Sequence, residues 1–328
     1  MPDLGDLKRR ARGALLGVAI GDAMGAPCEG MSAQAIQQTY GVITGFLSEE
    51  AVGTDDTDFT IFNAHLILSY GTDITCEQVE AEWRDKLLSG AYHYRPGGFS
   101  DVISTRNLQA GLHVPQSGAF NHQIWSDGVA MAISPAGIAC AGRPDVAVRL
   151  ASALGSVSNA RDGLYAAQAV AAAISVGMVG AAPREMIETG VRFVPPDSWT
   201  ARVLARVLTL GIEGTDFEAA LKVIDDNLIV HWWPWADLVT EAVPAAMAVF
   251  VACGSDFARA VPSGVRLGRD ADTIGAIVGS LAGVYSGEDS IPADWKQRVS
   301  TASGKCIGFV AGRSITDVAD QLVAGGAP

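Results

Sequence analysis

The pattern of apolar and polar positions along the chain is typical of a helical protein. Apolar residues recur at helical spacing in twelve segments, whereas runs that alternate with a period of two are few, the best being VITGFL at residues 42–47. Capping residues precede several of the segments, as Thr75 does before CEQVEAEW and Asp216 before FEAALKVI. The predicted helices span 10–25, 59–70, 76–89, 144–154, 163–180, 183–191, 199–210, 216–226, 237–252, 255–261, 272–286 and 314–323.

The segments follow one another without a linker, a low-complexity tract or a regular repeat, so we predict one all-α domain over residues 1–328. The stretch from Ser89 to Trp125 is the loosest, because it is rich in Gly, His, Asn and Gln. A loop of that length in a compact domain is usually functional or disordered. The Ala-rich stretch LYAAQAVAAAISVGMVGAA is only weakly apolar and fits a buried helix better than a membrane span.

Two of the predicted helices carry glycine at every fourth position. Because residues four apart lie on one face of a helix, each series makes a stripe without side chains. Each interior glycine costs about 1 kcal/mol relative to alanine, and close packing of two helix backbones is the natural compensation. Acidic residues lie at one end of both helices, Asp22 and Glu29 near the first and Asp270 and Asp272 before the second. The stripes consist of Gly13, Gly17, Gly21 and Gly25, and of Gly275, Gly279, Gly283 and Gly287.

The net charge and the cysteine content indicate which partners and which cellular compartment to expect. The formal net charge of −13 disfavours nucleic-acid phosphates and anionic membranes as partners. Five widely spaced cysteines without a Cys-x-x-Cys pair indicate reduced thiols in the cytoplasm. Basic residues precede the apolar run GALLGVAIG, as in a signal peptide, but Asp22 ends that run early. We therefore expect a soluble cytoplasmic protein with a small-molecule or protein partner, and no nucleic-acid or membrane partner.

Two acidic clusters mark the starts of predicted helices. GTDDTDFT at residues 53–60 contains Asp55, Asp56 and Asp58, and the nearest lysine or arginine in sequence is Arg84. GRDADTIGAIVG at residues 268–279 contains the second cluster. Helix capping is one explanation, since acids are favoured at helix N-termini. A cap uses one residue, however, and each cluster holds more than one acid.

Taken together, the clusters predict a hard-oxygen metal site. Mg²⁺ takes six oxygen ligands, and two such ions in one site usually lie about 3.5–4 Å apart. The spacing of an EF-hand calcium loop is absent. Asp58 is interpreted either as a group that supports the ligands or as an exposed acid. The predicted ligands are Thr54, Asp55, Asp56, Asp270, Asp272 and Thr273.

Three motifs, RGALLGVAIGDAMGAPCEG, GTDDTDFT and GRDADTIGAIVGSLAGVYSG, resemble in order and spacing the motifs of the ADP-ribosylglycohydrolase family. The resemblance runs from about residue 10 to residue 295. It implies an all-α fold with a dinuclear Mg²⁺ centre, or Mn²⁺ in its place, bound by the six residues named above. It also implies a metal-binding and catalytic role for Glu29. The catalytic residues implied are Glu29, Asp55, Asp56 and Asp272.

The segment WSDGVAMAISPAGI at residues 125–138 resembles the substrate loop of that family. A glycine-containing turn can present backbone N–H groups to phosphate, and the alternative is an ordinary helix start capped by Asp127. The chain departs from the family in having Asp127 for Asn, Ala132 for Arg and Ser158-Asn159 for a Thr-His pair. These changes are expected to weaken diphosphate binding. The implied substrate-binding residues are Asp127, Gly128, Val129, Ala130 and Met131.

Other residues admit two interpretations each. Asp101 is predicted to be a solvated loop carboxylate, with a second catalytic acid as the alternative. The aromatic run HWWPW at residues 231–235 is predicted to plug the core or a helix junction, with stacking on a base or aglycone as the alternative. Arg266 and Arg269 flank the second acidic cluster and either reach a ligand phosphate or balance local charge.

Three functions are compatible with these features. The first is a metal-dependent hydrolase that cleaves the C1 bond of an ADP-ribosyl group from a protein side chain or small acceptor, with Glu29 or a metal-bound water as the base. The second is a hydrolase of another N- or O-ribosyl compound, such as a nucleoside or nucleotide, at the same dinuclear site. The third is a non-catalytic member that binds ADP-ribose or serves structurally.

Overall fold

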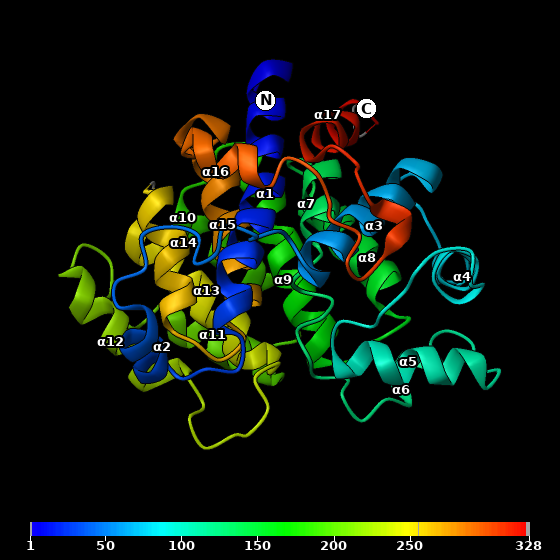
Figure 1. The fold of residues 1–328 in the computed structure, drawn as a ribbon, viewed down its shortest axis with the longest axis horizontal. Coiled ribbons are helices and arrows are strands. Elements are labelled where there is room, and N and C mark those ends of the chain that lie inside the picture. The colour runs from blue at the N-terminus through cyan, green and yellow to red at the C-terminus, as the bar shows by residue number, and fades with distance from the viewer. Residues whose placement is uncertain (1, 255, 326–328) are drawn as a thin grey trace.

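The computed structural model describes residues 2–254 and 256–325, and these residues form helices and no strand (Figure 1). Each segment predicted to be helical contains a helix, so the all-α prediction is confirmed. Ser255, the first residue of the predicted helix 255–261, lies outside the described residues. The helices are α1 (Leu4–Gly25), α2 (Ala33–Tyr40), α3 (Asp55–Tyr70), α4 (Cys76–Glu82), α5 (Phe99–Gln109), α6 (Gln116–Ala119), α7 (Ser134–Ala139), α8 (Pro144–Gly155), α9 (Asp162–Gly177), α10 (Pro183–Arg192), α11 (Trp199–Val207), α12 (Phe217–Leu228), α13 (Val239–Cys253), α14 (Phe257–Arg266), α15 (Ala271–Ser286), α16 (Ala293–Arg298) and α17 (Ile315–Gly325). A π-helical turn, Trp83–Leu88, continues α4, and short 3-10 helices cover Ala26–Cys28, Glu288–Ser290 and Gly308–Val310.

Helices α1 and α15 pack together in the middle of the molecule (Figure 1). Their glycine stripes face each other, as the spacing predicted. A Cβ atom added to Gly17 would lie 2.0 Å from the carbonyl oxygen of Gly279, and one added to Gly13 would lie 2.3 Å from that of Gly283. Only glycine permits so close an approach of two helix backbones. The two helices therefore run antiparallel and bring their acidic ends, the C-terminal end of α1 and the N-terminal end of α15, to the same place.

The remaining long helices surround this pair with one contiguous hydrophobic core. Helix α9 contains most of the Ala-rich stretch and is buried along much of its length, as predicted. Helix α13 is buried over the whole of Val239–Phe250. Among the residues that the structure describes, no helix is long and apolar enough to cross a membrane.

The prediction of a loose stretch over residues 89–125 is wrong in part, because α5 and α6 lie within it. Apolar periodicity does not reveal helix α5, because the buried face of this helix is largely polar. Ser100, Asp101 and Ser104 are buried on this face, with Leu108 as the apolar exception. The loop that precedes α5 does approach the site described below, since Gly97 and Gly98 line its pocket.

Helix α3 begins at Asp55, four residues before the predicted start at Phe59. The early start places the acids of GTDDTDFT inside the first helical turn, where the exposed N–H groups and the helix dipole favour negative charge. The segment 42–47, which had the best alternating pattern, forms no strand. Both acidic clusters therefore lie at helix N-termini.

Candidate metal centre and adjoining pocket

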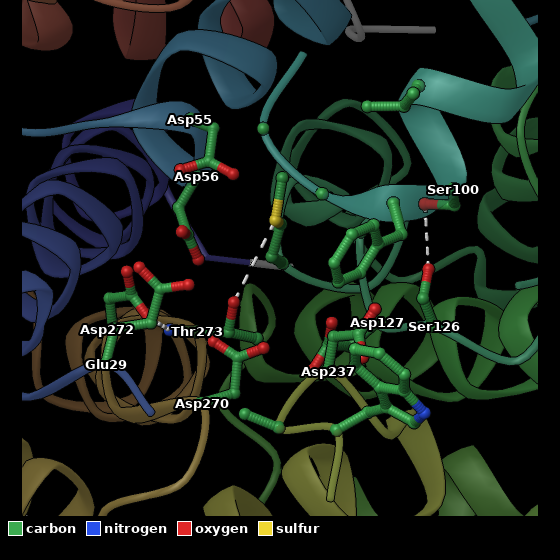
Figure 2. Close-up of a pocket in the computed structure, with 18 of the residues that line it drawn as sticks. Glu29, Asp55, Asp56, Ser100, Ser126, Asp127, Asp237, Asp270, Asp272 and Thr273 are labelled. Atoms are coloured by element: carbon green, nitrogen blue, oxygen red, sulfur yellow. Dashed lines mark hydrogen bonds between the residues drawn. The ribbon is translucent and has the colours of Figure 1, made fainter. Parts of the chain in front are cut away.

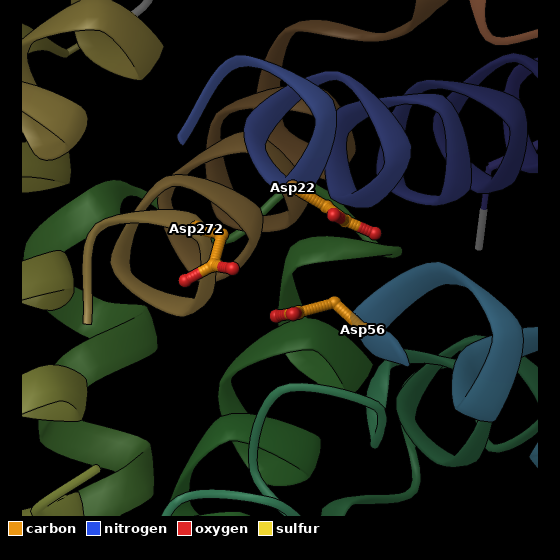
Figure 3. A group of neighbouring side chains, drawn as sticks. All are labelled: Asp22, Asp56 and Asp272. Carbon is orange, nitrogen blue, oxygen red and sulfur yellow. The ribbon is translucent and has the colours of Figure 1, made fainter. Parts of the chain in front are cut away.

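Carboxylates from three helices meet where α1 ends and α15 begins (Figure 3). Asp22 belongs to the last turns of α1, Asp56 to the first turn of α3 and Asp272 to the first turn of α15. One carboxylate oxygen of each lies within 4.8 Å of the other two. All three residues are buried, with relative exposures of 0%, 1% and 3%. The structure thus joins the two predicted acidic clusters and adds Asp22 to them.

Asp22 also fixes the start of α3. Its Oδ2 accepts hydrogen bonds from the backbone N–H groups of Thr54 (2.7 Å) and Thr57 (2.9 Å) and from the Thr57 hydroxyl (2.5 Å). Its Oδ1 accepts a hydrogen bond from the Thr54 hydroxyl (2.7 Å), which lies 3.1 Å from Oδ1 of Asp55. The first N–H groups of a helix have no partner within it, so this carboxylate caps α3 from a different helix. Thr54, a predicted ligand, is held beside the acids by this cap.

Burial and mutual repulsion dominate the electrostatics of the cluster. Burial raises the pKa of Asp22 to about 7, and the charge of Asp55 adds to the rise. Burial also raises the pKa of Asp56 well above its ordinary value, with further contributions from Asp22 and Asp272. The pKa of Asp272 is raised well above its ordinary value by burial and then by Asp270. These groups are costly to ionise together unless a cation joins them.

The donor set fits a hard divalent cation. Oδ1 of Asp56 is buried and has no hydrogen-bond partner in the described chain. An orphaned carboxylate oxygen of this kind needs an explanation, and a bound ion is a common one. Carboxylate and hydroxyl oxygens are the ligands that Mg²⁺ and Mn²⁺ prefer. The geometry therefore agrees with the acidic metal site predicted from the sequence.

The cluster opens into a cavity of about 320 Å³, a size that suits a small-molecule ligand (Figure 2). Seven carboxylates line this cavity, and its described lining contains no lysine, arginine or histidine. Of the predicted metal and catalytic residues, the lining includes Glu29, Asp55, Asp56, Asp270, Asp272 and Thr273.

A short backbone pairing brings Glu29 beside the start of α15. The N–H of Gly30 donates to the carbonyl of Arg269 (2.8 Å), and the N–H of Arg269 donates to that of Met31 (2.7 Å). Arg269 adopts a left-handed conformation with φ of 62°, which is uncommon for a residue with a side chain. Gly268 also has a positive φ, of 70°, and a Cβ there would lie 2.4 Å from the Met31 carbonyl oxygen. Burial raises the pKa of Glu29.

The predicted substrate loop is only partly exposed to the pocket. Asp127, Gly128 and Met131 line it, whereas Val129 and Ala130 are buried at 5% and 1% exposure and lie outside its lining. The N–H of Met131 donates to the carbonyl of Asp127 (3.0 Å). The alternative interpretation, a helix capped by Asp127, is wrong, because α7 begins only at Ser134.

Asp58 supports the fold from outside the pocket. Its carboxylate accepts hydrogen bonds from the backbone N–H groups of Gly304 (3.0 Å), Cys306 (2.8 Å) and Ile307 (3.1 Å). The residue is fully buried, so the interpretation as an exposed acid is wrong. Asp58 instead ties the first turn of α3 to the loop before α17.

Asp101 is not the solvated loop carboxylate that we predicted. It lies in the first turn of α5, is 3% exposed, and its Oδ2 accepts a hydrogen bond from the N–H of Gly98 (3.5 Å). Burial raises its pKa to about 7, with a contribution from Asp55. No feature of the sequence indicated this burial, since the residue follows a glycine pair in a polar stretch.

The aromatic run HWWPW is not a core plug. Trp232 is 80% exposed, and Trp235 is 44% exposed and lines the pocket together with Pro234. The ring of Trp235 meets that of Phe99 edge to face, with centroids 5.4 Å apart. The alternative that we considered, stacking on a ligand, is therefore compatible with the position of Trp235.

Arg266 and Arg269 are both engaged in ion pairs within the protein. Arg266 binds both carboxylate oxygens of Glu218 (3.0 and 2.9 Å) on an exposed surface. Arg269 donates to the fully buried Glu241 (2.8 Å) and to the carbonyl of Trp235 (2.8 Å). These contacts match the charge-balancing interpretation. Because Glu241 also accepts from the N–H of Val230, Arg269 and Glu241 clamp both ends of the loop 230–235.

Arg269→Ala is expected to lower the free energy of unfolding by about 3 kcal/mol, because it leaves the buried Glu241 carboxylate without its cation. It is also expected to raise KM for any ligand that contacts Trp235, since the loop loses its anchor. Arg266→Ala is the matched control, and loss of its exposed pair should cost less than about 1 kcal/mol. Chemical denaturation of both variants measures the difference. Equal effects of the two substitutions would contradict the clamp.

Sequence reasoning did not assign Asp22 to the metal site or Asp237 to the pocket. Asp22 carried a signal, because it lies between Gly21 and Gly25 of the first glycine stripe, but it was not assigned as a ligand. Trp235, which was considered as a stacking residue, and Asp237, which was predicted to begin a helix, both reach the pocket from a loop. Asp237 becomes recognisable only when tertiary structure places it beside Asp127 (Figure 2).

Known proteins resemble this chain in sequence and in fold. A family model described as ADP-ribosylglycohydrolase matches residues 3–327. The chain is 25% identical over 310 residues to the ADP-ribosyl-[dinitrogen reductase] glycohydrolase of Rhodospirillum rubrum, covering 88% of this chain and 90% of that one. It is 23% identical over 327 residues to the ADP-ribosylhydrolase ARH3 of Gallus gallus, covering 88% of each chain.

A solved structure described as an ADP-ribosylglycohydrolase-related protein complex has the same fold, with a TM-score of 0.69 at 22% identity. The match covers 98% of this chain and 100% of the other. The family match spans nearly the whole chain, includes all three motifs and agrees with the fold. The chain therefore belongs to the ADP-ribosylglycohydrolase family and is a glycohydrolase.

Proposed function

We propose that this protein is an Mg²⁺-dependent hydrolase that cleaves the C1 glycosidic bond between an ADP-ribosyl group and a protein side chain or small acceptor. Family membership supports hydrolysis of ADP-ribosyl groups. The observation that carries the metal dependence is the buried meeting of Asp22, Asp56 and Asp272, with an orphaned oxygen on Asp56. Five free cysteines support a cytoplasmic location.

Two divalent ions are the expected complement of this site, Mg²⁺ first and Mn²⁺ as a substitute. When bound, such ions supply Lewis-acid and template chemistry, which polarises substrate oxygens and orients the sugar. The chain would hold them through oxygens of Asp22, Thr54, Asp55, Asp56, Asp270, Asp272 and Thr273.

The other roles in the reaction belong to Glu29, Phe99 and Trp235. Glu29 lines the pocket beside the acidic cluster and is the base that accepts a proton from the attacking water. The pairing of Gly30 with Arg269 holds Glu29 in register with α15. Phe99 and Trp235 form an apolar wall that keeps bulk water away from the reacting bond.

A second candidate substrate class keeps this site and omits the diphosphate. The observation in its favour is the lining of the pocket, which contains seven carboxylates and no basic side chain among its described residues. Even two divalent cations would leave part of that negative charge unbalanced. An N- or O-ribosyl compound such as a nucleoside avoids the repulsion that a diphosphate would meet.

The test is hydrolysis of a substrate panel by protein stripped of metal and then supplied with Mg²⁺ or Mn²⁺. The panel comprises ADP-ribosyl-arginine, ADP-ribosyl-serine, O-acetyl-ADP-ribose and simple nucleosides. Metal-dependent release of ADP-ribose from at least one ADP-ribosyl substrate is the expected result. Turnover confined to compounds without a diphosphate would establish the second candidate, and no metal-dependent turnover would contradict both.

A further inference from the structure

A second pair of acids lies in the pocket, apart from the three-helix cluster. Asp127 and Asp237 come from two chain segments that pair through their backbones. The N–H of Asp127 donates to the carbonyl of Asp237 (3.2 Å), and that of Val239 donates to the carbonyl of Trp125 (3.1 Å). Figure 2 shows the two carboxylates side by side, separated from Asp56 and Asp272.

Both carboxylates have an oxygen without a partner. Asp127 is 2% exposed, and its Oδ2 is buried without a hydrogen bond in the described structure. Oδ2 of Asp237 is buried and unsatisfied as well. Burying a carboxylate oxygen without a donor is expensive. Both residues line the pocket, so a ligand there can supply the missing donors.

A metal ion is a poor explanation of this pair. Neither Asp127 nor Asp237 belongs to the group of Asp22, Asp56 and Asp272, and two carboxylates alone supply few of the six oxygen ligands that Mg²⁺ takes. Two adjacent carboxylate acceptors match a ligand that presents two N–H donors side by side, in the geometry of a forked hydrogen bond.

Aromatic rings line the same pocket. Phe99 and Trp235 both line it, are 50% and 44% exposed, and pack edge to face at 79°. Trp235 lies two residues before Asp237 on the same loop. Exposed rings beside paired acceptors favour a flat, nitrogen-bearing group, because such a group can stack on a ring while its edge donates hydrogen bonds.

We propose that Asp127 and Asp237 recognise a planar substrate group with two adjacent N–H donors, which stacks against Phe99 or Trp235. This inference rests on the proposed function, because it assumes that a ribosyl substrate enters this pocket. Two chemical groups share these properties: the amide–amine edge of a guanine-type base, and an alkylguanidinium. The pair thus acts as a specificity site next to the metal centre.

Binding of small probes to the whole protein tests the proposal. Guanosine, inosine and methylguanidinium would each be titrated calorimetrically in the presence of Mg²⁺. Inosine lacks the 2-amino group and so offers only one of the two donors. Guanosine binding more tightly than inosine would identify a base as the source, and binding of methylguanidinium would identify a guanidinium. Failure of both guanosine and methylguanidinium to bind would overturn the proposal.

The carboxylates are tested by Asp127→Asn and Asp237→Asn, which keep the side-chain shape and remove the charge. Each is expected to weaken binding of the preferred probe about tenfold or more, in line with the loss of a bidentate hydrogen bond. Asp226→Asn, on the exposed face of α12, is the matched control and should leave binding unchanged. Unchanged affinity in both pocket variants would refute the assignment.

Measurements on Asp237→Asn distinguish a failure of this inference from a failure of the proposed function. The rise in Tm on adding Mg²⁺ reports on the three-helix cluster and is expected to persist in Asp237→Asn. Metal-dependent hydrolysis of an ADP-ribosyl substrate with an unchanged KM in Asp237→Asn would overturn the inference alone. Probe binding that depends on Asp237, in a protein without metal-dependent turnover, would support the inference and remove the proposed function.

Discussion

Asp272→Asn is expected to lower turnover by about a hundredfold or more and to abolish the rise in Tm that Mg²⁺ produces. Asp272 is 3% exposed and contributes a carboxylate oxygen within 4.8 Å of those of Asp22 and Asp56. Loss of a group that only supports a metal ligand typically costs 10- to 100-fold in affinity or activity, so loss of a ligand should cost at least as much. Steady-state kinetics and thermal melting, each with and without Mg²⁺, measure the two effects.

The same substitution is expected to stabilise the metal-free protein by about 1 kcal/mol, since it removes one charge from a buried cluster of acids that repel each other. A change that merely damaged the fold would lower the metal-free Tm instead. Asp226→Asn serves as the control, because Asp226 is exposed and pairs with Lys222, four residues earlier in the same helix. Full activity and an undiminished Mg²⁺ response in Asp272→Asn would remove the metal mechanism.

The glycine stripes indicate from the sequence that two helix backbones pack closely, and the structure shows which acids this packing brings together. Glycine at every fourth position restricts a helix to a partner with an equally bare face, and α1 and α15 are such partners. Acids at the C-terminal end of one helix and the N-terminal end of the other can meet only if the helices are antiparallel. The pairing of Gly17 with Gly279 and the meeting of Asp22 with Asp272 are thus two consequences of one pattern.

Contributions from loops and polar faces could not be predicted in the same way. The buried face of α5 presents Ser100, Asp101 and Ser104, whose polarity conceals the helix from a search for apolar periodicity. Trp235 and Asp237 lie in a loop, where no period relates sequence position to direction. The place of Trp235 depends on a hydrogen bond from Arg269 to its carbonyl, and that of Asp237 on one from the N–H of Asp127, and both are tertiary contacts.

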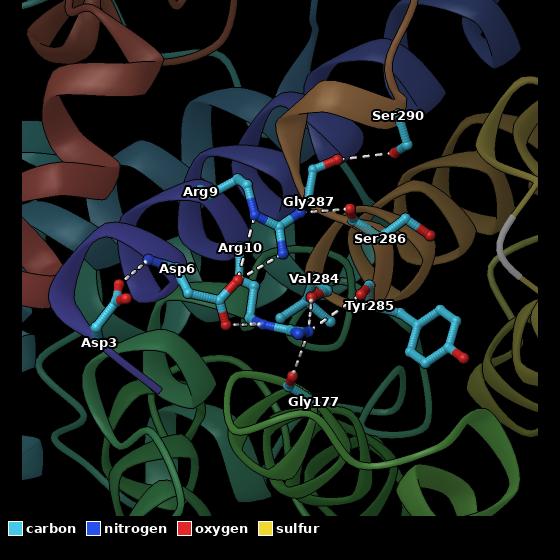
Figure 4. A network of polar contacts seen from close by, with 10 residues as sticks. All are labelled: Asp3, Asp6, Arg9, Arg10, Gly177, Val284, Tyr285, Ser286, Gly287 and Ser290. Atoms are coloured by element: carbon cyan, nitrogen blue, oxygen red, sulfur yellow. Dashed lines mark hydrogen bonds and ion pairs between the residues drawn. The ribbon is translucent and has the colours of Figure 1, made fainter. Parts of the chain in front are cut away.

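Two arginines near the N-terminus also occupy positions that the sequence pattern does not explain. Arg9 and Arg10 lie near the start of α1, where positive charge is unfavourable to the helix dipole. In the structure Arg9 donates to the carbonyl of Ser286 (2.6 Å), and Arg10 donates to those of Val284 (3.1 Å) and Tyr285 (3.0 Å), at the C-terminal end of α15 (Figure 4). Cations satisfy the free carbonyls of that helix end. The antiparallel partner supplies these carbonyls, and Asp6 pairs with both arginines from within α1.

Gly21→Ala is expected to reduce both the stability of the protein and its affinity for Mg²⁺. A Cβ on Gly21 would lie 2.1 Å from the carbonyl carbon and oxygen of Gly275. Alanine normally favours a helix by about 1 kcal/mol over glycine, but a clash with backbone cannot be relieved by a rotamer change. The helices must move apart, at an expected net cost of about 2 kcal/mol. Asp22, the next residue, then moves away from Asp272.

Gly13→Ala distinguishes the loss of stability from the loss of Mg²⁺ affinity. Its Cβ would lie 2.3 Å from the carbonyl oxygen of Gly283, so a similar loss of stability is expected. Gly13 lies eight residues from Gly21, or about 12 Å along the helix, so the folded protein should keep its Mg²⁺ affinity. Urea unfolding and Mg²⁺ titration of both variants give the comparison, with Gly5→Ala, at the open end of α1, as the control. Equal losses of Mg²⁺ affinity at both positions would show that the site does not depend on local helix spacing. A loss confined to Gly21→Ala would make the close approach of α1 and α15 a condition for metal binding.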